Sequence, residues 1–105
     1  MKHMKPGIEL IADERQRQID AEGWTPAHDD EHTQGELSDA AACYALGKRL
    51  PVWPWSTDWW KPGEALIGGR VRDLVKAGAL IAAEIDRINR LPPNHMVSRG
   101  GTPSA

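Results

Sequence analysis

Seven positions in the second half of the chain repeat with alternating steps of four and three residues. This spacing places them on one face of an α-helix, so it predicts a long amphipathic helix. We place its secure part from Arg70 to Arg90, about 30 Å long, because a glycine pair precedes it and Pro92 follows it. Since seven positions make a short seam, we favour a core helix of a small bundle over a partner-binding coiled coil. The heptad seam consists of Ile67, Val71, Leu74, Gly78, Ile81, Ile85 and Ile88.

Two further helices are predicted upstream. The first spans Pro6–Glu22, with isoleucines along one face, and Gly23 ends it. The second spans about Gly35–Arg49. Proline interrupts the one β-rich stretch, residues 52–60, so no strand of useful length is expected. We therefore expect an all-α domain of three helices, with a long loop rich in tryptophan and proline between the second and third helices.

The composition limits the classes of protein to which the chain can belong. Its 105 residues allow one modest core and exclude a large multidomain enzyme. We assign residues 1–91 to one helical domain and residues 92–105, which lack periodicity, to a flexible tail. The net charge of −2 argues against a binder of duplex nucleic acid. No stretch resembles a membrane helix or a signal peptide, and Cys43 is the only cysteine, so we expect a cytoplasmic protein without membrane association.

Six potential metal ligands lie between residues 28 and 36. If the two histidines of this segment occupy one helical turn, they share a face, and a neighbouring carboxylate completes a site suited to a divalent cation such as Mg²⁺ or Mn²⁺. The alternative, which we favour, is that the aspartates cap the next helix and the histidines are solvated. The candidate ligands are His28, Asp29, Asp30, His32 and Glu36.

Four of the five tryptophans lie between residues 53 and 60, in a loop stiffened by prolines. Indole faces stack on purine or nicotinamide rings, and a nearby cation can hold an attached phosphate. Alternatively, the tryptophans form the aromatic core of a chain that has no Phe and one Tyr, and both hold if two rings are inside and two face a ligand. The candidate ligand-binding residues are Trp24, Trp53, Trp55, Trp59, Trp60, Lys61, Arg15 and Arg72.

Charged residues on the predicted helices are assigned by their position relative to the apolar faces. Arg15 is in line with isoleucines, so it either points inward toward a carboxylate (Asp29, Asp30 or Glu36) or a ligand phosphate, or lies at the edge of the apolar stripe. The charged residues of the third helix lie off the heptad seam and are expected on the surface. They are Arg72, Asp73, Glu84, Asp86 and Arg87.

Four sequence blocks together resemble a family of small proteins, of no established activity, that tailed phages and prophages encode. The blocks are ERQRQIDAEGWTPAHDDEH, GELSDAAACYA, WPWSTDWWKP and RDLVKAGALIAAEIDR, and they span about residues 14–87. The resemblance implies a phage origin. Small phage proteins include helical sponges that sequester nucleotide-derived immune signals, a role that needs only a pocket with aromatic platforms and cations.

A weaker resemblance is to the all-α nucleotide pyrophosphohydrolases of the MazG type, which bind magnesium through ExxE and ExxD pairs on two helices. Glu36 and Asp39 match the ExxD pair, whereas the first helix has no ExxE pair. This resemblance implies a metal-dependent hydrolase.

These observations lead to three functional hypotheses. The first is an oligomeric phage protein that binds a nucleotide-like small molecule through the tryptophan loop and the segment from Trp24 to Glu36. The second is a divalent-metal nucleotide pyrophosphohydrolase that uses the candidate metal ligands. The third is an inhibitor that binds a host protein through the tryptophan loop. We name no catalytic residue, and we expect a homo-oligomer.

Overall fold

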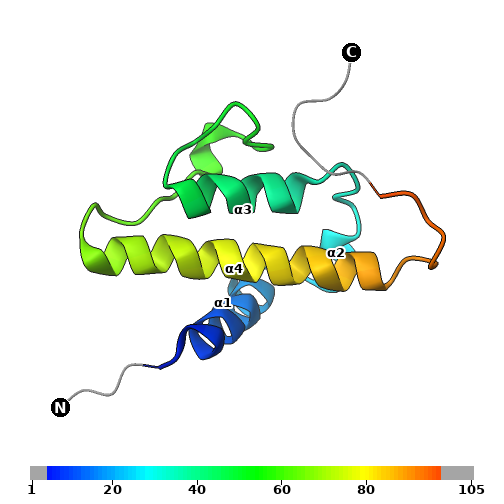
Figure 1. The fold of residues 1–105 in the computed structure, drawn as a ribbon, viewed down its shortest axis with the longest axis horizontal. Coiled ribbons are helices and arrows are strands. Elements are labelled where there is room, and N and C mark those ends of the chain that lie inside the picture. The colour runs from blue at the N-terminus through cyan, green and yellow to red at the C-terminus, as the bar shows by residue number, and fades with distance from the viewer. Residues whose placement is uncertain (1–4, 98–105) are drawn as a thin grey trace.

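The computed structural model describes residues 5–97, and this part of the chain is all-α without strands (Figure 1). α4 is the longest helix. α3 runs antiparallel along one side of it, α1 crosses its other side, and α2 lies beside its C-terminal half. No helix among the described residues has both the length and the apolarity to cross a bilayer. The elements are α1 (Gly7–Glu22), α2 (Pro26–Asp29), α3 (Glu36–Leu46), the 3₁₀ turn η1 (Thr57–Trp59) and α4 (Ile67–Asn89).

The three long helices agree with the prediction, and their ends differ from it by a few residues. Gly47 adopts a left-handed conformation (φ 72°) that ends α3 at Leu46, three residues before the predicted end. α4 begins at Ile67, three residues early. The one-turn helix α2 is not predicted. Of the predicted tail, residues 98–105 lie outside the described residues.

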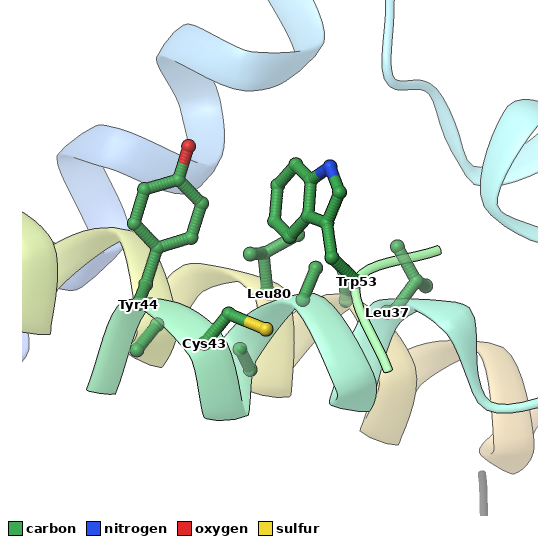
Figure 2. Packing of buried hydrophobic residues seen from close by; sticks show 9 residues of the cluster. Leu37, Cys43, Tyr44, Trp53 and Leu80 are labelled. Atoms are coloured by element: carbon green, nitrogen blue, oxygen red, sulfur yellow. The ribbon is translucent and has the colours of Figure 1, made fainter. Parts of the chain in front are cut away.

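The core lies between α3 and α4 and is covered by the tryptophan loop (Figure 2). Small residues dominate where the two helices meet, which lets their backbones approach closely. Trp53 comes from the loop and packs edge-on against Tyr44, with ring centroids 5.8 Å apart. The buried cluster is Leu37, Ala40, Ala41, Cys43, Tyr44, Trp53, Ala77, Leu80 and Ala83.

The heptad seam is not the core face of α4, so this prediction is wrong for the single chain. Five of its residues are between 37% and 85% exposed, and the buried face of α4 lies on the opposite side of the helix. The pattern of large aliphatic residues identified the helix correctly but not the face that α3 covers. The exposed seam residues are Ile67, Val71, Leu74, Ile81 and Ile85.

Three charged residues of α4 that were expected on the surface are buried. Arg87 donates two hydrogen bonds to Glu84, of 2.6 and 3.0 Å, and the pair is almost fully enclosed. Asp73 accepts a hydrogen bond of 2.7 Å from the backbone N–H of Gly63. Each buried charge therefore has a partner, as burial requires. Asp86 is exposed, as expected.

The contact between Asp73 and Gly63 belongs to a close backbone approach at the start of α4. A Cβ atom added to Gly69 would lie 1.8 Å from the carbonyl oxygen of Glu64, which leaves no room for a side chain. Neighbouring Gly68 has nothing within 4 Å of the same position. The close approach therefore requires glycine at position 69, whereas position 68 has room for a side chain.

This difference gives a matched pair of substitutions. We expect Gly69→Ala to lower the free energy of unfolding by roughly 2–3 kcal/mol, because backbone must move. Gly68→Ala is expected to leave stability unchanged or raise it by up to about 1 kcal/mol, since alanine favours the helix. Urea unfolding followed by circular dichroism measures both, and equal effects of the two variants would contradict this account of the loop.

A buried carboxylate joins α1 to α4. Glu14 is 3% exposed and accepts hydrogen bonds from Arg17 (2.8 and 3.0 Å) and Arg72 (2.6 Å). Burial alone would raise the pKa of Glu14, but the hydrogen bonds from the two arginines outweigh it and hold this pKa below the ordinary value of 4.5.

Because the folded-state pKa is lowered, Glu14 stabilises the fold above its unfolded pKa, and this contribution is lost as the pH falls through the folded value. We expect Glu14→Gln to cost roughly 1–3 kcal/mol at neutral pH. We also expect it to flatten the loss of stability below pH 4.5. Thermal unfolding from neutral to acid pH tests this, with Glu9→Gln at an exposed position of α1 as the control. An acid profile unchanged in Glu14→Gln would show that other groups govern it.

Candidate functional site

A pocket of about 390 Å³ lies where the end of α1, α2 and the tryptophan loop meet. Its walls carry three indole rings, two imidazole rings and one carboxylate, and they come from two segments far apart in the sequence. This volume is within the roughly 300–1,000 Å³ range of small-molecule sites. The residues of this tryptophan pocket are Glu22, Trp24, His28, His32, Trp55, Ser56 and Trp59.

The first wall is built by the turn between α1 and α2. Gly23 takes a left-handed conformation (φ 73°) that ends α1, and the N–H of Trp24 then bonds the carbonyl of Gln18 at 3.0 Å. Thr25 caps α2 by accepting a hydrogen bond from the N–H of His28 (3.3 Å). As a result, Trp24 and His28 project into the same pocket, with parallel rings 6.2 Å apart.

Arg15 holds this wall from behind. Its guanidinium forms an ion pair with Asp29, which is fully buried, and donates a second hydrogen bond of 3.1 Å to the carbonyl of Trp24. Of the two positions expected for Arg15, the structure has the inward one. Arg15 thereby fixes α2 relative to α1, and it does not line the pocket.

The second wall is the loop after α3. The indole N–H of Trp53 donates to the carbonyl of Ser56 at 3.1 Å, and the hydroxyl of Ser56 caps the 3₁₀ turn by accepting from the N–H of Asp58 (3.3 Å). Trp55 lies between the core and the pocket, with its ring 5.5 Å from that of Trp53 and 5.4 Å from that of His32.

The tryptophans therefore divide between the two roles considered above. Trp53 is buried, and Trp60 packs on it and on Tyr44, so both rings belong to the aromatic core. Trp55 and Trp59 line the pocket together with Trp24. The mixed arrangement, with two rings inside and two facing a pocket, is the one that the structure has.

Both pocket histidines carry a buried ring nitrogen without a hydrogen-bond partner among the described residues. These atoms are Nδ1 of His28 and Nε2 of His32. Nδ1 of His28 is 3.5 Å from the carboxylate of Asp29, and the other ring nitrogen of His32, Nδ1, is 3.7 Å from the carboxylate of Glu36. Both distances are too long for good hydrogen bonds. Nδ1 of His28 thus faces Oδ1 of Asp29, a buried oxygen that also lacks a hydrogen-bond partner among the described residues. The pocket is lined by the imidazole rings, whereas Nδ1 of His28 and Nε2 of His32 are enclosed.

The candidate cations lie at different distances from the pocket. The ammonium group of Lys61 is 5.5 Å from the ring centroid of Trp59. Lys61 does not line the tryptophan pocket but a smaller adjoining cavity, which shares Glu22, Trp24 and Trp59 with it. The backbone of Lys61 is held by Lys76, whose ammonium group donates a hydrogen bond of 2.8 Å to the carbonyl oxygen of Lys61. Burial, and secondly the charge of Arg72, lower the pKa of Lys76. Arg72 pairs with Glu14 in a separate groove, so the structure does not bring it to the tryptophan pocket.

Arginines pair with two of the five candidate metal ligands. Asp29 pairs with Arg15, and Asp30 pairs with Arg90 at 2.7 Å. Within residues 5–97, no group of three or more His, Cys, Asp or Glu side chains is arranged to hold a metal ion. The alternative role is not observed either, because the N-cap of α3 is Gly35 and neither aspartate caps this helix.

Two residues of the pocket were not singled out from the sequence. Glu22 lines it and is paired with Arg17 at 3.1 Å, and Ser56 lies between the two pocket tryptophans of the loop. The only available signal was proximity in the sequence, since Glu22 comes two residues before Trp24.

A scan against protein-family models finds no match to the chain, and searches of curated proteins and of solved structures find none either.

The division of the tryptophans gives a stability test. We expect Trp53→Ala to lower the free energy of unfolding by roughly 3–5 kcal/mol, because a buried ring is removed from the core. Trp59 is 49% exposed, so Trp59→Ala is expected to cost less than about 1 kcal/mol. Denaturant unfolding of the two variants measures the difference, and a large loss for Trp59→Ala would assign this ring to the core.

Proposed function

We propose that the protein binds a nucleotide-like small molecule in the tryptophan pocket. The observation that carries this proposal is the convergence of three indole and two imidazole rings on one pocket. These flat walls favour a planar aromatic ring as the ligand.

The charges around the pocket suggest how such a ligand would be oriented. The base would enter between the indoles, where the carboxylate of Glu22 can accept a hydrogen bond from an exocyclic amino group. The sugar and phosphate would then extend past Trp59 toward Lys61 in the adjoining cavity.

Binding without chemical change is the role that we propose for this pocket. In a phage protein, which the sequence blocks resemble, it would serve to sequester a nucleotide-derived immune signal of the host. The metal-dependent hydrolase has less support, since arginines pair with Asp29 and Asp30. The hypothesis of an inhibitor that binds a host protein also has less support, because Trp53 and Trp60 pack in the core and are not available as an exposed binding surface.

The test is a panel of nucleotides and cyclic dinucleotides, scored by thermal shift and calorimetry. We expect at least one ligand of the panel to raise the melting temperature, with or without Mg²⁺ or Mn²⁺, and to be recovered chemically unchanged. Trp59→Ala should weaken its binding by about 5- to 150-fold, because base stacking on an aromatic ring contributes roughly 1–3 kcal/mol. Lys61→Ala should weaken binding of the phosphorylated ligand more than that of its nucleoside.

Met96→Ala is the matched control, because Met96 is 89% exposed and lies outside the tryptophan pocket. It should bind as the wild type does. If no member of the panel shifts the wild type, or if Trp59→Ala binds with unchanged affinity, the pocket does not have this function. Turnover of the ligand would replace sequestration by catalysis.

A further inference from the structure

Two enclosed polar atoms behind the tryptophan pocket face each other without a partner. Nδ1 of His28 and Oδ1 of Asp29 are 3.5 Å apart, and neither has a hydrogen bond among the described residues. The other carboxylate oxygen of Asp29, Oδ2, pairs with Arg15. An unprotonated Nδ1 would place two acceptors opposite each other, and burying two unpaired acceptors costs free energy. A proton on Nδ1 satisfies both atoms at once, because the N–H can donate to Oδ1.

The accessible part of His28 is the other side of its ring. The side chain is 37% exposed and lines the tryptophan pocket, although Nδ1 is enclosed. The second ring nitrogen, Nε2, is not enclosed, and no hydrogen bond from the described residues occupies it. A neutral imidazole carries one proton on its two nitrogens, so a proton on Nδ1 leaves Nε2 as a hydrogen-bond acceptor.

A carboxylate oxygen is the second acceptor of the same pocket. Oε1 of Glu22 accepts a hydrogen bond of 3.1 Å from Arg17, whereas Oε2 has no partner within the part of the chain that the structure describes. Neither lysine nor arginine is among the residues that line this pocket. A planar ligand between the indoles therefore pairs with Glu22 and with Nε2 of His28 only if it brings hydrogen-bond donors of its own.

We propose that Asp29 holds His28 in the Nδ1–H tautomer, so that the pocket selects a nucleobase with N–H groups on its edge. This inference rests on the proposed function, because it concerns the ligand of the same pocket. His28 determines specificity through the contact of Nε2 with the base. Asp29 is a positioning residue that acts through His28, and Arg15 fixes the orientation of its carboxylate. Guanine is the expected base, because its ring N–H and its 2-amino group are neighbouring donors for the two acceptors.

The tautomer of His28 is measured in the free protein, before any ligand is added. ¹⁵N NMR of the imidazole rings at mildly alkaline pH, where such rings are neutral, distinguishes the protonated ring nitrogen from the unprotonated one. We expect the proton on Nδ1 of His28. The resonances are assigned by their absence in His28→Phe. A proton on Nε2 of His28 in the wild type would overturn the proposal, whatever the protein binds.

Asp29→Asn is the variant that should reverse the tautomer while keeping the shape of the side chain. Arg15 needs an acceptor, so the amide oxygen of the variant stays on Arg15 and the amide NH₂ group faces Nδ1 of His28. Because this NH₂ group can only donate, we expect the proton of His28 to move to Nε2. Circular dichroism reports whether the variant folds, and the wild-type spectrum alone decides the tautomer if it does not.

Selection by the pocket is tested with three nucleotides that differ at the edge of the base. Guanosine 5′-monophosphate carries a ring N–H and an amino group there, adenosine 5′-monophosphate carries an amino group, and purine riboside 5′-monophosphate carries no N–H. We expect calorimetry to show that the wild type prefers the guanine nucleotide over the purine riboside nucleotide by about 10-fold or more. Asp29→Asn should remove most of this preference, because an N–H at Nε2 of His28 would meet the N–H groups of the base.

Asp30→Asn is the matched control, because Asp30 pairs with Arg90 outside the tryptophan pocket. It should keep both the tautomer and the preference. Equal affinity of the wild type for the guanine and purine riboside nucleotides would overturn the selection. So would binding of another member of the nucleotide panel when none of these three binds, and the proposed function would then stand. If nothing in the panel binds, the proposed function fails, and the NMR spectrum still shows whether Asp29 sets the tautomer of His28.

Discussion

The ion pair between Arg15 and Asp29 determines how the two walls of the tryptophan pocket meet. α2 is one turn long and contributes little apolar packing, so its position depends on polar contacts. Asp29 is fully buried, and without Arg15 its charge would be uncompensated. The planar guanidinium of Arg15 has enough donors to hold the carbonyl of Trp24 as well. The spacing between Trp24 and His28 is therefore set by one side chain behind the pocket.

Local rules were sufficient to predict the three long helices, since each depends on the periodicity of its own residues and on the glycines and prolines at its ends. The clustering of tryptophan and histidine residues in the sequence also identified the two segments that form the pocket. Local rules could not divide the tryptophans. Trp53 is core because its indole N–H reaches the carbonyl of Ser56 and its ring meets Tyr44, which depends on the path of the loop over α3.

The burial of α4 was the least predictable feature, and two physical reasons explain this. Periodicity identifies an apolar face but not which neighbour covers it, and the face that meets α3 consists mainly of alanines with Leu80. The same face contains Asp73 and the pair of Glu84 with Arg87. The partner of Asp73, the N–H of Gly63, is ten residues away in an irregular loop. A pattern of residue types shows where the charged residues are, but not the hydrogen-bond and ion-pair partners that allow them to be buried.

This distribution of residues leaves much of the apolar surface of the domain on its outside. Leu37 and Leu80 are the large aliphatic residues that are almost completely buried, whereas isoleucines are concentrated on the outward face of α4 and at the start of α1. A domain of this size buries a limited fraction of its surface, and here many of its large aliphatic side chains are exposed. Covering these side chains with a partner would add burial that the single chain lacks. A partner that binds only the folded chain would also stabilise the folded state by mass action, so the exposed isoleucines are the part of the fold through which association could change its stability.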